Sequence, residues 1–338
     1  MLFNQAEVDS KDQHIWRNER SDLISRLRQL CNKNSIVFTT DTGNILANKK
    51  NVAFWPGDLL NSYEYYQELN KICSNKNAIL FVLTDNFITF EDLEFVRFHS
   101  DPKLHFLFCS FSNDAKTNLN PSKLYNCFIQ RVCSVRQSWF YFLYLRQLLD
   151  KGYVSFLLKQ LRSYSELTGI ALFDFIHSKY ELGNVPKFEE AYNLLRPMVP
   201  YCNFIENADL SHYIADSKYS LVLETYATDP ATDRWFVGEK AIRALCFPAV
   251  PLLFVQTGTV EKLRTIGFEI DYHDQIDNLN WIDRQRCLLD LLENDAIDTS
   301  YKHNYNRAMH NRAIGSAGKH RFQNSDYFDE FITKVLEH

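Results

Sequence analysis

The chain has 338 residues, of which 46% are hydrophobic and 14% aromatic, with only 10 glycines and 9 prolines. This composition is that of an ordered globular protein and excludes a disordered chain. The length allows two domains, because single cores rarely grow past roughly 250–300 residues. The formal net charge of −5 lacks the basic excess of proteins that grip a nucleic-acid backbone.

The first third of the chain alternates short apolar runs with amphipathic segments. This pattern is typical of a mostly parallel sheet that helices cover on both faces. Several runs stop at turn residues, as at Asp41-Thr-Gly43 and Pro56-Gly57. The predicted helices are 21–32, 63–72 and 90–99, and the predicted strands are 35–40, 51–55, 78–83 and 104–109.

The rest of the chain predicts a second α/β unit after a helical, strongly aromatic middle. The aromatic run 139–144 is more often core than a sugar platform, and residues 172–186 carry no assignment. We expect an α/β protein with two Rossmann-like domains, 1–120 and 121–300, and a helical tail over 301–338. The predicted elements are a helix from 136, strands 153–156, 219–225 and 250–255, helices 208–216, 239–245 and 259–266 with Gly267 as C-cap, and helices from about 281 onward.

The eight cysteines are scattered and form no Cys-x-x-Cys pair. A zinc site is therefore not expected, and buried free thiols in a reducing compartment are favoured over disulfides. The N-terminus has neither the basic nor the apolar region of a signal peptide, and no apolar run approaches the ~20 residues of a membrane span. We expect a cytoplasmic protein without a membrane span.

The stretch 233–258 holds the most informative pattern. It places Glu239 and Lys240 at the start of a predicted helix, and a buried strand and a Thr257-Gly258 turn follow. A charged pair at a helix start, beside the end of a parallel strand, suits a phosphorylated ligand. An isolated Glu-Lys pair is more often a solvated surface pair, so the surrounding pattern decides the interpretation.

That pattern resembles the donor-binding domain of GT-B glycosyltransferases, most strongly over residues 219–268. The similarity is to the fucosyltransferase-like group with viral and bacterial relatives, whose hallmark is an aromatic residue followed by Val-Thr-Glu-Lys. This chain has Phe236-Val-Gly-Glu-Lys240, with Gly238 in place of the usual Thr. A Pro-flanked strand, a Gly turn and a Leu-x-x-x-Gly-Phe ending follow, here Leu263–Phe268. The resemblance implies two domains facing a cleft, with the acceptor on the N-terminal domain and the donor on the C-terminal one.

The resemblance also implies roles for individual residues. Lys240 is expected to contact the donor diphosphate, and Glu239 to accept hydrogen bonds from ribose or sugar hydroxyls. A weaker match over 126–139 implies that an arginine, Arg136 or alternatively Arg131, contacts the diphosphate. Without a metal, lysine, arginine and helix amides must meet the charge that grows on that leaving group. Further donor-side candidates are Phe236 or Trp235, stacked on the base or ribose, together with Tyr226 and Gly258.

An inverting transfer needs a general base. The resemblance implies a position at a strand end in the first domain, where Asp41 and Asp85 are the candidates. The ordinary alternative for each is a helix cap or a turn residue. Asp229 and Asp233 lie four positions apart and do not form the Asp-x-Asp of metal-dependent relatives, so no metal is expected.

The expected function is transfer of a sugar from a nucleoside-diphosphate sugar, such as a GDP- or UDP-sugar, to a glycan or other hydroxyl acceptor. A hexosyl- or fucosyltransferase-like enzyme fits this description. One alternative is a non-catalytic nucleotide-sugar-binding protein with a degenerate GT-B site. Another is a transferase acting on modified DNA, which the acidic charge balance disfavours. Fold alone fixes neither the donor nor the acceptor.

Overall fold

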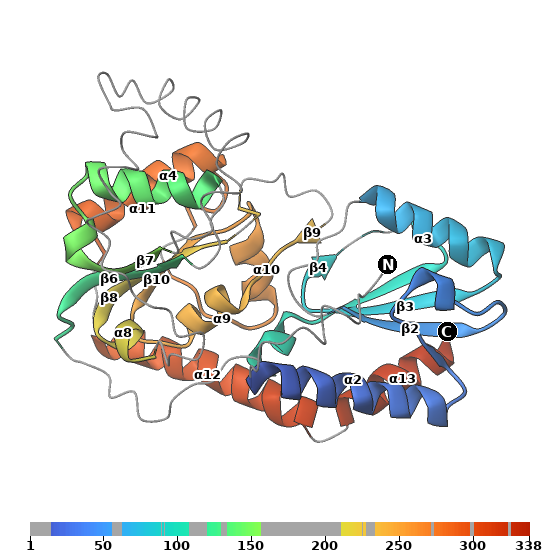
Figure 1. Ribbon diagram of the computed structural model, residues 1–338. Coiled ribbons are helices and arrows are strands. Elements are labelled where there is room, and N and C mark those ends of the chain that lie inside the picture. The colour runs from blue at the N-terminus through green and yellow to red at the C-terminus, as the bar shows by residue number, and fades with distance from the viewer. Residues whose placement is uncertain are drawn as a thin grey trace. The chain divides into compact units, whose positions relative to one another are not determined.

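The structure is a computed structural model, and its helices and strands divide between two compact units (Figure 1). The first unit combines Met1–Ser110 with Ala231–Ile242 and Arg312–His338, and the second combines Phe111–Pro230 with Arg243–Asn311. The first unit thus takes 231–242 from the expected second domain and 312–338 from the expected tail. The residues described are 15–55, 63–88, 90, 92–107, 120–129, 134–156, 211–224, 226–227, 234–271, 274–297, 301–323 and 326–338.

The first unit is built on a parallel four-stranded sheet with the order β1-β2-β3-β5. Its central strand β3 has five successive buried residues, because helices cover both of its faces. Two of the predicted strands, 51–55 and 78–83, are confirmed, whereas the run 35–40 forms a strand of only two residues. The strands are β1 (Val37–Phe38), β2 (Lys50–Trp55), β3 (Ile79–Thr84) and β5 (Val96–Ser100).

Alternate side chains of this sheet enter two separate cores. Phe81 and Leu83 pack with α2 and α13 on one face, whereas Leu80 and Val82 pack with α3 on the other. The C-terminal helix α13 is therefore part of the first unit's core, and Lys50 Nζ donates to the carbonyl oxygens of its last turn at 2.8 Å. The helices are α2 (Ile15–Lys33), α3 (Tyr63–Asn75) and α13 (Asp326–Glu337).

Two sequence predictions in the first unit are wrong. The helix expected over 90–99 is replaced by strand β5, which pairs in parallel with β3. The strand expected over 104–109 is instead a 3-10 helix, η2 (Pro102–Leu107). Asp101 begins η2 by accepting the Lys103 backbone N–H on its carboxylate at 3.0 Å, and the fixed φ of Pro102 suits the first helical position.

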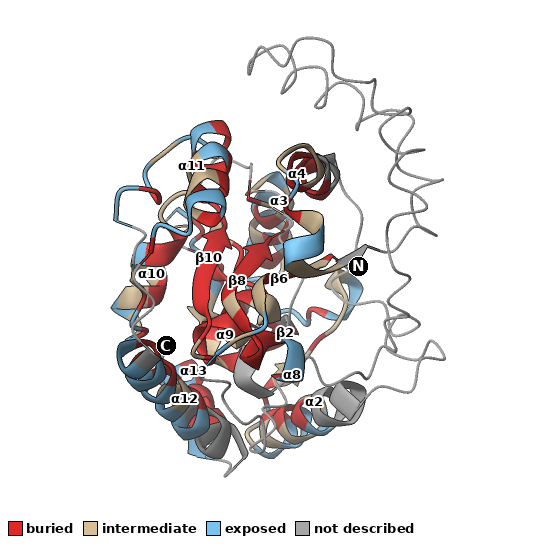
Figure 2. Ribbon diagram, turned by 90° about the vertical axis from the view of Figure 1, so that its left-hand side faces the viewer, coloured by how far each residue is buried: buried red, intermediate tan, exposed pale blue. Residues whose placement is uncertain are grey.

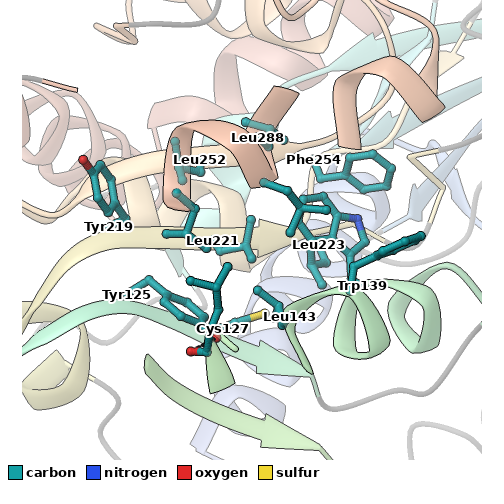
Figure 3. Close-up of a cluster of buried hydrophobic side chains, with 14 of the residues drawn as sticks. Tyr125, Cys127, Trp139, Leu143, Tyr219, Leu221, Leu223, Leu252, Phe254 and Leu288 are labelled. Atoms are coloured by element: carbon teal, nitrogen blue, oxygen red, sulfur yellow. Dashed lines mark hydrogen bonds between the residues drawn. The ribbon is translucent and has the colours of Figure 1, made fainter. Parts of the chain in front are cut away.

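The second unit holds another parallel four-stranded sheet, with the order β10-β8-β6-β7. Its inner strands are buried (Figure 2), and the predicted strands 153–156, 219–225 and 250–255 are confirmed. Side chains from three strands meet α4 and α11 in one apolar core (Figure 3), in which Trp139 packs edge-on against Phe254. The strands are β6 (Lys123–Ile129), β7 (Gly152–Phe156), β8 (Ser217–Leu223) and β10 (Val250–Phe254).

The helices of the second unit follow the predicted order. Gly267, with φ 102°, ends α10 as expected: its N–H bonds Arg264 O, while Phe268 N–H bonds Leu263 O, which is a Schellman cap. Within the described residues, no helix has the length and apolar character to cross a membrane. The helices are α4 (Ser134–Leu145), η3 (Leu149–Lys151), α8 (Ser211–Ala215), α10 (Thr259–Thr265) and α11 (Trp281–Asn294). Two further helices, α9 (Glu239–Leu245) and α12 (Tyr301–Gln323), have residues in both units.

The buried side of α12 is polar rather than apolar. Arg307 donates to Phe247 O and Ala249 O at 3.2 and 2.9 Å. Asn311 donates to Leu245 O and accepts the Glu269 N–H, both at 2.9 Å. These bonds satisfy backbone groups of loops and of the last residue of α9. The helix is therefore held through polar contacts on its buried side.

The described cysteines confirm the expectation of free thiols. Cys31, Cys73, Cys127 and Cys246 are buried and unbridged, and Cys287 is half-buried. Burial raises the pKa of Cys31 and Cys127 to about 12 and that of Cys73 to about 11. These thiols are thus packed in protonated form and are poor nucleophiles. The remaining three cysteines lie outside the described residues.

We expect Gly152→Ala to destabilise the second unit. A Cβ at position 152 would lie 2.5 Å from the ring of Tyr125, which is fully buried and donates to Leu148 O. Overpacking of this kind costs about 1–3 kcal/mol. Gly43→Ala is the matched control, since a Cβ there meets its nearest atom at 3.9 Å. Urea unfolding of both variants measures the difference, and equal stabilities would contradict the prediction.

Candidate functional site

The hallmark segment, residues 234–240, begins with a short strand in the first unit. Arg234–Trp235 form β9, which pairs antiparallel with β4 (Phe87–Ile88) (Figure 1). In this pairing Trp235 stands opposite Phe87. Strand β4 is itself fixed by Ser100, whose Oγ accepts the Ile88 N–H at 3.2 Å. Strand β3 ends at Thr84, and β4 begins three residues later, at Phe87. The segment is therefore attached beside the carboxyl end of β3. No short-range pattern in the sequence reveals this pairing.

Helix α9 begins at Glu239, as predicted. Lys240 Nζ lies 2.8 Å from Glu239 Oε1, and both side chains are 29% exposed. The two charges are thus paired but remain in contact with solvent, where an ion pair is worth only about 0–1 kcal/mol. Gly238 accepts the Ile242 N–H and offers no side-chain hydroxyl. An incoming anion can therefore compete for Lys240 at small cost.

Asp85 follows β3 directly and is fully buried, as is Asn86. Asn86 Nδ2 donates to Asp85 Oδ1 at 3.2 Å, and the Asn86 backbone N–H donates to Thr84 Oγ1 at the same distance. Because Phe87 is the next residue and pairs with Trp235, the first unit brings Asp85 to the segment that leads to Lys240. A buried carboxylate at the carboxyl end of a parallel strand is a functional-site candidate.

Asp41, the other candidate base, is the N-cap of the 3-10 helix η1 (Thr42–Asn44). The Gly43 backbone N–H donates to its carboxylate at 3.1 Å and, with the Thr42 hydroxyl, lowers the pKa of Asp41. The capping role that is the ordinary alternative for an aspartate here is thus confirmed.

Neither aromatic candidate of the hallmark is a fully exposed ring on which a base or ribose could stack. Phe236 is only 2% exposed, and Trp235 is half-buried within β9. Phe236 is therefore a buried hydrophobic side chain in this structure. Tyr226 belongs to the second unit, where it lies half-buried in the turn after β8.

Arg136 lies in the first turn of α4 and is 2% exposed. Its Nε and one terminal nitrogen both donate to Leu223 O, at 3.0 and 2.8 Å. This forked contact holds the carboxyl end of β8 against α4. The alternative, Arg131, lies outside the described residues, as do Asp229 and Asp233.

Gly258 occupies the turn between β10 and α10 with φ 81°, a left-handed conformation that favours glycine. The backbone N–H groups of Gly258, Val260 and Glu261 act on the Asp277 carboxyl group. An internal carboxyl group thus already faces these amides at the start of α10. Sequence reasoning missed Asp277 because its contacts join residues from separate loops.

Arg284 completes this buried arrangement and is 1% exposed. It donates to Val255 O and Thr257 Oγ1 before the turn, and to Leu279 O at 2.7 Å after Asp277. Burial raises the pKa of Asp277 despite the opposing effects of Arg284 and the α10 amides. The two residues therefore fix the Gly258 turn from inside the second unit.

The candidate residues fall into two sets. The first unit contains Asp41, Asp85, Phe236, Glu239 and Lys240, and the second contains Arg136, Tyr226 and Gly258. Across the described part of the chain, no group of three or more metal-ligating side chains is found.

Comparisons with protein-family models, curated proteins and solved structures give no match to this chain. The resemblance to GT-B glycosyltransferases therefore rests on the residues of the hallmark region alone.

We expect Asp277→Asn to gain stability relative to the wild type as pH rises from about 3 to 7. The fold raises the pKa of Asp277 above its ordinary value, because burial favours the neutral carboxyl group over the ionised one. The wild type therefore loses stability as the pH rises through the folded-state pKa and this carboxyl group ionises. Asparagine has no such loss. Urea unfolding across this pH range tests the trend against Asp274→Asn, whose side chain is 78% exposed. A difference that stays flat or falls with pH would refute it.

Proposed function

We propose that the protein is a glycosyltransferase that uses a nucleoside-diphosphate sugar and needs no metal. One observation carries this proposal: the β4–β9 pairing attaches the hallmark segment beside the strand end that holds Asp85. A cationic side chain for the leaving group and a carboxylate for the incoming hydroxyl thereby belong to one structural unit. Together with the family resemblance, this supports sugar transfer over other uses of an α/β fold.

Lys240 meets the charge of the leaving group in this proposal. As the bond between the anomeric carbon and the diphosphate oxygen breaks, its electron pair stays on the diphosphate. The Lys240 ammonium group binds that oxygen or its neighbours and stabilises the developing charge. Glu239, released from Lys240, accepts hydrogen bonds from ribose or sugar hydroxyls. The half-exposed position of both side chains allows this exchange of partners.

Asp85 acts as the general base in an inverting transfer. The acceptor hydroxyl gives its proton to the carboxylate while its oxygen forms the new bond to the anomeric carbon. Every bond that breaks has a matching acceptor, since the diphosphate takes one electron pair and Asp85 takes the proton. Asp85 is preferred over Asp41 because the carboxylate of Asp41 caps η1.

The second unit, taken by itself, also has features that suit a nucleotide. Its parallel sheet matches the class that the resemblance assigns to donor binding, and ligands of such sheets bind beyond the carboxyl ends of the strands. Arg136 donates to the carbonyl of the last residue of β8, and Arg284 donates to the carbonyl of the residue just after β10. Tyr226 and the Gly258 turn lie at the same strand ends and are the candidates of this unit for binding a nucleoside.

We expect Lys240→Ala to weaken donor binding and turnover. Loss of a hydrogen bond between charged groups costs about 1.5–3 kcal/mol, so kcat/KM should fall roughly 10- to 100-fold. Lys218→Ala is the matched control, because its ammonium group is also paired with a carboxylate and its side chain is 25% exposed. The measurement is hydrolysis or transfer with a panel of GDP- and UDP-sugars. Equal activity of the wild type and Lys240→Ala would refute the assignment.

A nucleotide-sugar-binding protein without activity is the second candidate. Gly238 replaces the threonine of the hallmark, and both Asp85 and Phe236 are buried, which favours a degenerate site. Isothermal titration with the same nucleotide sugars separates the two functions. Binding that Lys240→Ala abolishes, without turnover of any donor, supports the binding protein instead of the enzyme.

A further inference from the structure

Two exposed leucines lie at the amino end of the first unit's sheet. Leu46 is 54% exposed and Leu336 is 48% exposed, the highest values for large apolar side chains within the described residues. Leu46 lies in the loop before β2, where its backbone N–H donates to Asn51 Oδ1 at 3.0 Å. The carbonyl oxygen of Leu336, in the last turn of α13, accepts from Lys50 Nζ at 2.8 Å. Both leucines are therefore anchored to the first two residues of β2.

The same edge of the sheet is rich in lysine. Helices α2 and α3 end there, each shortly before a strand begins, and the last turn of α13 lies beside β2. The segments 30–36, 44–50, 72–78 and 334–337 contain a single acidic residue, Glu337. In a chain whose net charge is −5, these short segments hold five lysines, Lys33, Lys49, Lys50, Lys76 and Lys334. The edge is thus locally cationic.

A structural role accounts for two of these lysines. Lys50 Nζ donates to two carbonyls of the last turn of α13, and Lys76 Nζ donates to a loop carbonyl at 2.7 Å, as is common for cations near helix C-termini. Lys33, Lys49 and Lys334 are exposed. Among the described residues, none provides a hydrogen bond or ion pair to these three ammonium groups. They are available to an anion from outside the protein.

Exposed leucines among lysines suit a partner that is negatively charged at its surface and apolar beneath. A nucleic-acid backbone offers phosphates to lysine but no apolar layer in which a leucine is buried. A bilayer with anionic lipids has both, because its charged headgroups cover the acyl chains. Residues 46–49 are all exposed, so that Leu46 and Lys49 reach the headgroup layer together. The combination favours an anionic bilayer over a nucleic acid.

We propose that this edge of the first unit binds the surface of a membrane that contains anionic lipids. The lysine ammonium groups bind the lipid phosphates, while Leu46 and Leu336 enter the boundary between headgroups and acyl chains. The contact lies on the membrane and needs no spanning helix. It uses the amino ends of the strands, whereas Asp85 follows the carboxyl end of β3. The inference is therefore independent of the proposed sugar transfer.

Sedimentation of the full chain with lipid vesicles tests the charge. The protein should bind vesicles with roughly 30% phosphatidylserine and not those of phosphatidylcholine alone. Lys49→Glu combined with Lys334→Glu should weaken binding at least 10-fold, because each lysine at an anionic surface contributes about a factor of five. Lys151→Glu combined with Lys302→Glu is the matched control, since both lysines are exposed in the second unit. Equal losses in the two double variants would overturn the proposal.

Leu46→Ser tests the apolar part of the contact. It should weaken vesicle binding roughly 5-fold, whereas Met309→Ser, which changes an exposed apolar side chain of α12, should leave binding unchanged. Because the changed side chains are exposed, both variants should melt at the temperature of the wild type. If the wild type binds no anionic vesicles, or binds duplex DNA in their place, the proposal is wrong. Neither result bears on sugar transfer, which the nucleotide-sugar assay measures separately.

Discussion

The antiparallel pairing of β4 with β9 is the interaction on which the candidate site depends. These two short strands come from distant parts of the chain, and the pairing of Phe87 with Trp235 brings them into one unit. The hallmark segment is thereby fixed to the end of the first sheet, although the sequence places it between elements of the second. A ribbon this short is marginal by itself, so its anchor to Ser100 next to β3 gives it a defined position.

Much of the fold was predictable because parallel strands buried on both faces appear in the sequence as continuous apolar runs. Strands β3, β8 and β10 are of this kind, and Gly267 ends α10 through its left-handed conformation as expected. The errors fall where that rule fails. Strand β5 buries only Val96, so it shows no apolar run, and η2 is an apolar run that a capping aspartate and a proline turn into a 3-10 helix.

The candidate site was predictable only in its local part. The hallmark predicted that Glu239 and Lys240 begin a helix, because helix starts are encoded by neighbouring residues. The residues that hold the turns, such as Asp277 and Arg284, are polar and buried, and their partners lie in other loops. Buried polar residues follow neither the period of a helix nor that of a strand. Only the folded chain reveals which carbonyl each one satisfies.

Arg136 and Lys240 differ in the partner that a bound ligand would have to displace. Arg136 donates twice to Leu223 O in a buried position, and removing it would leave a carbonyl unsatisfied at a cost of about 1–3 kcal/mol. Lys240 is half-exposed and pairs with its sequence neighbour, so a diphosphate that replaces Glu239 leaves a carboxylate that water can solvate. The difference favours Lys240 as the exchangeable cation, while the buried arginine gives the strand end its shape. In the proposed transferase, the cation that binds and releases the diphosphate is better placed on the residue whose partner can be replaced at a small cost in free energy.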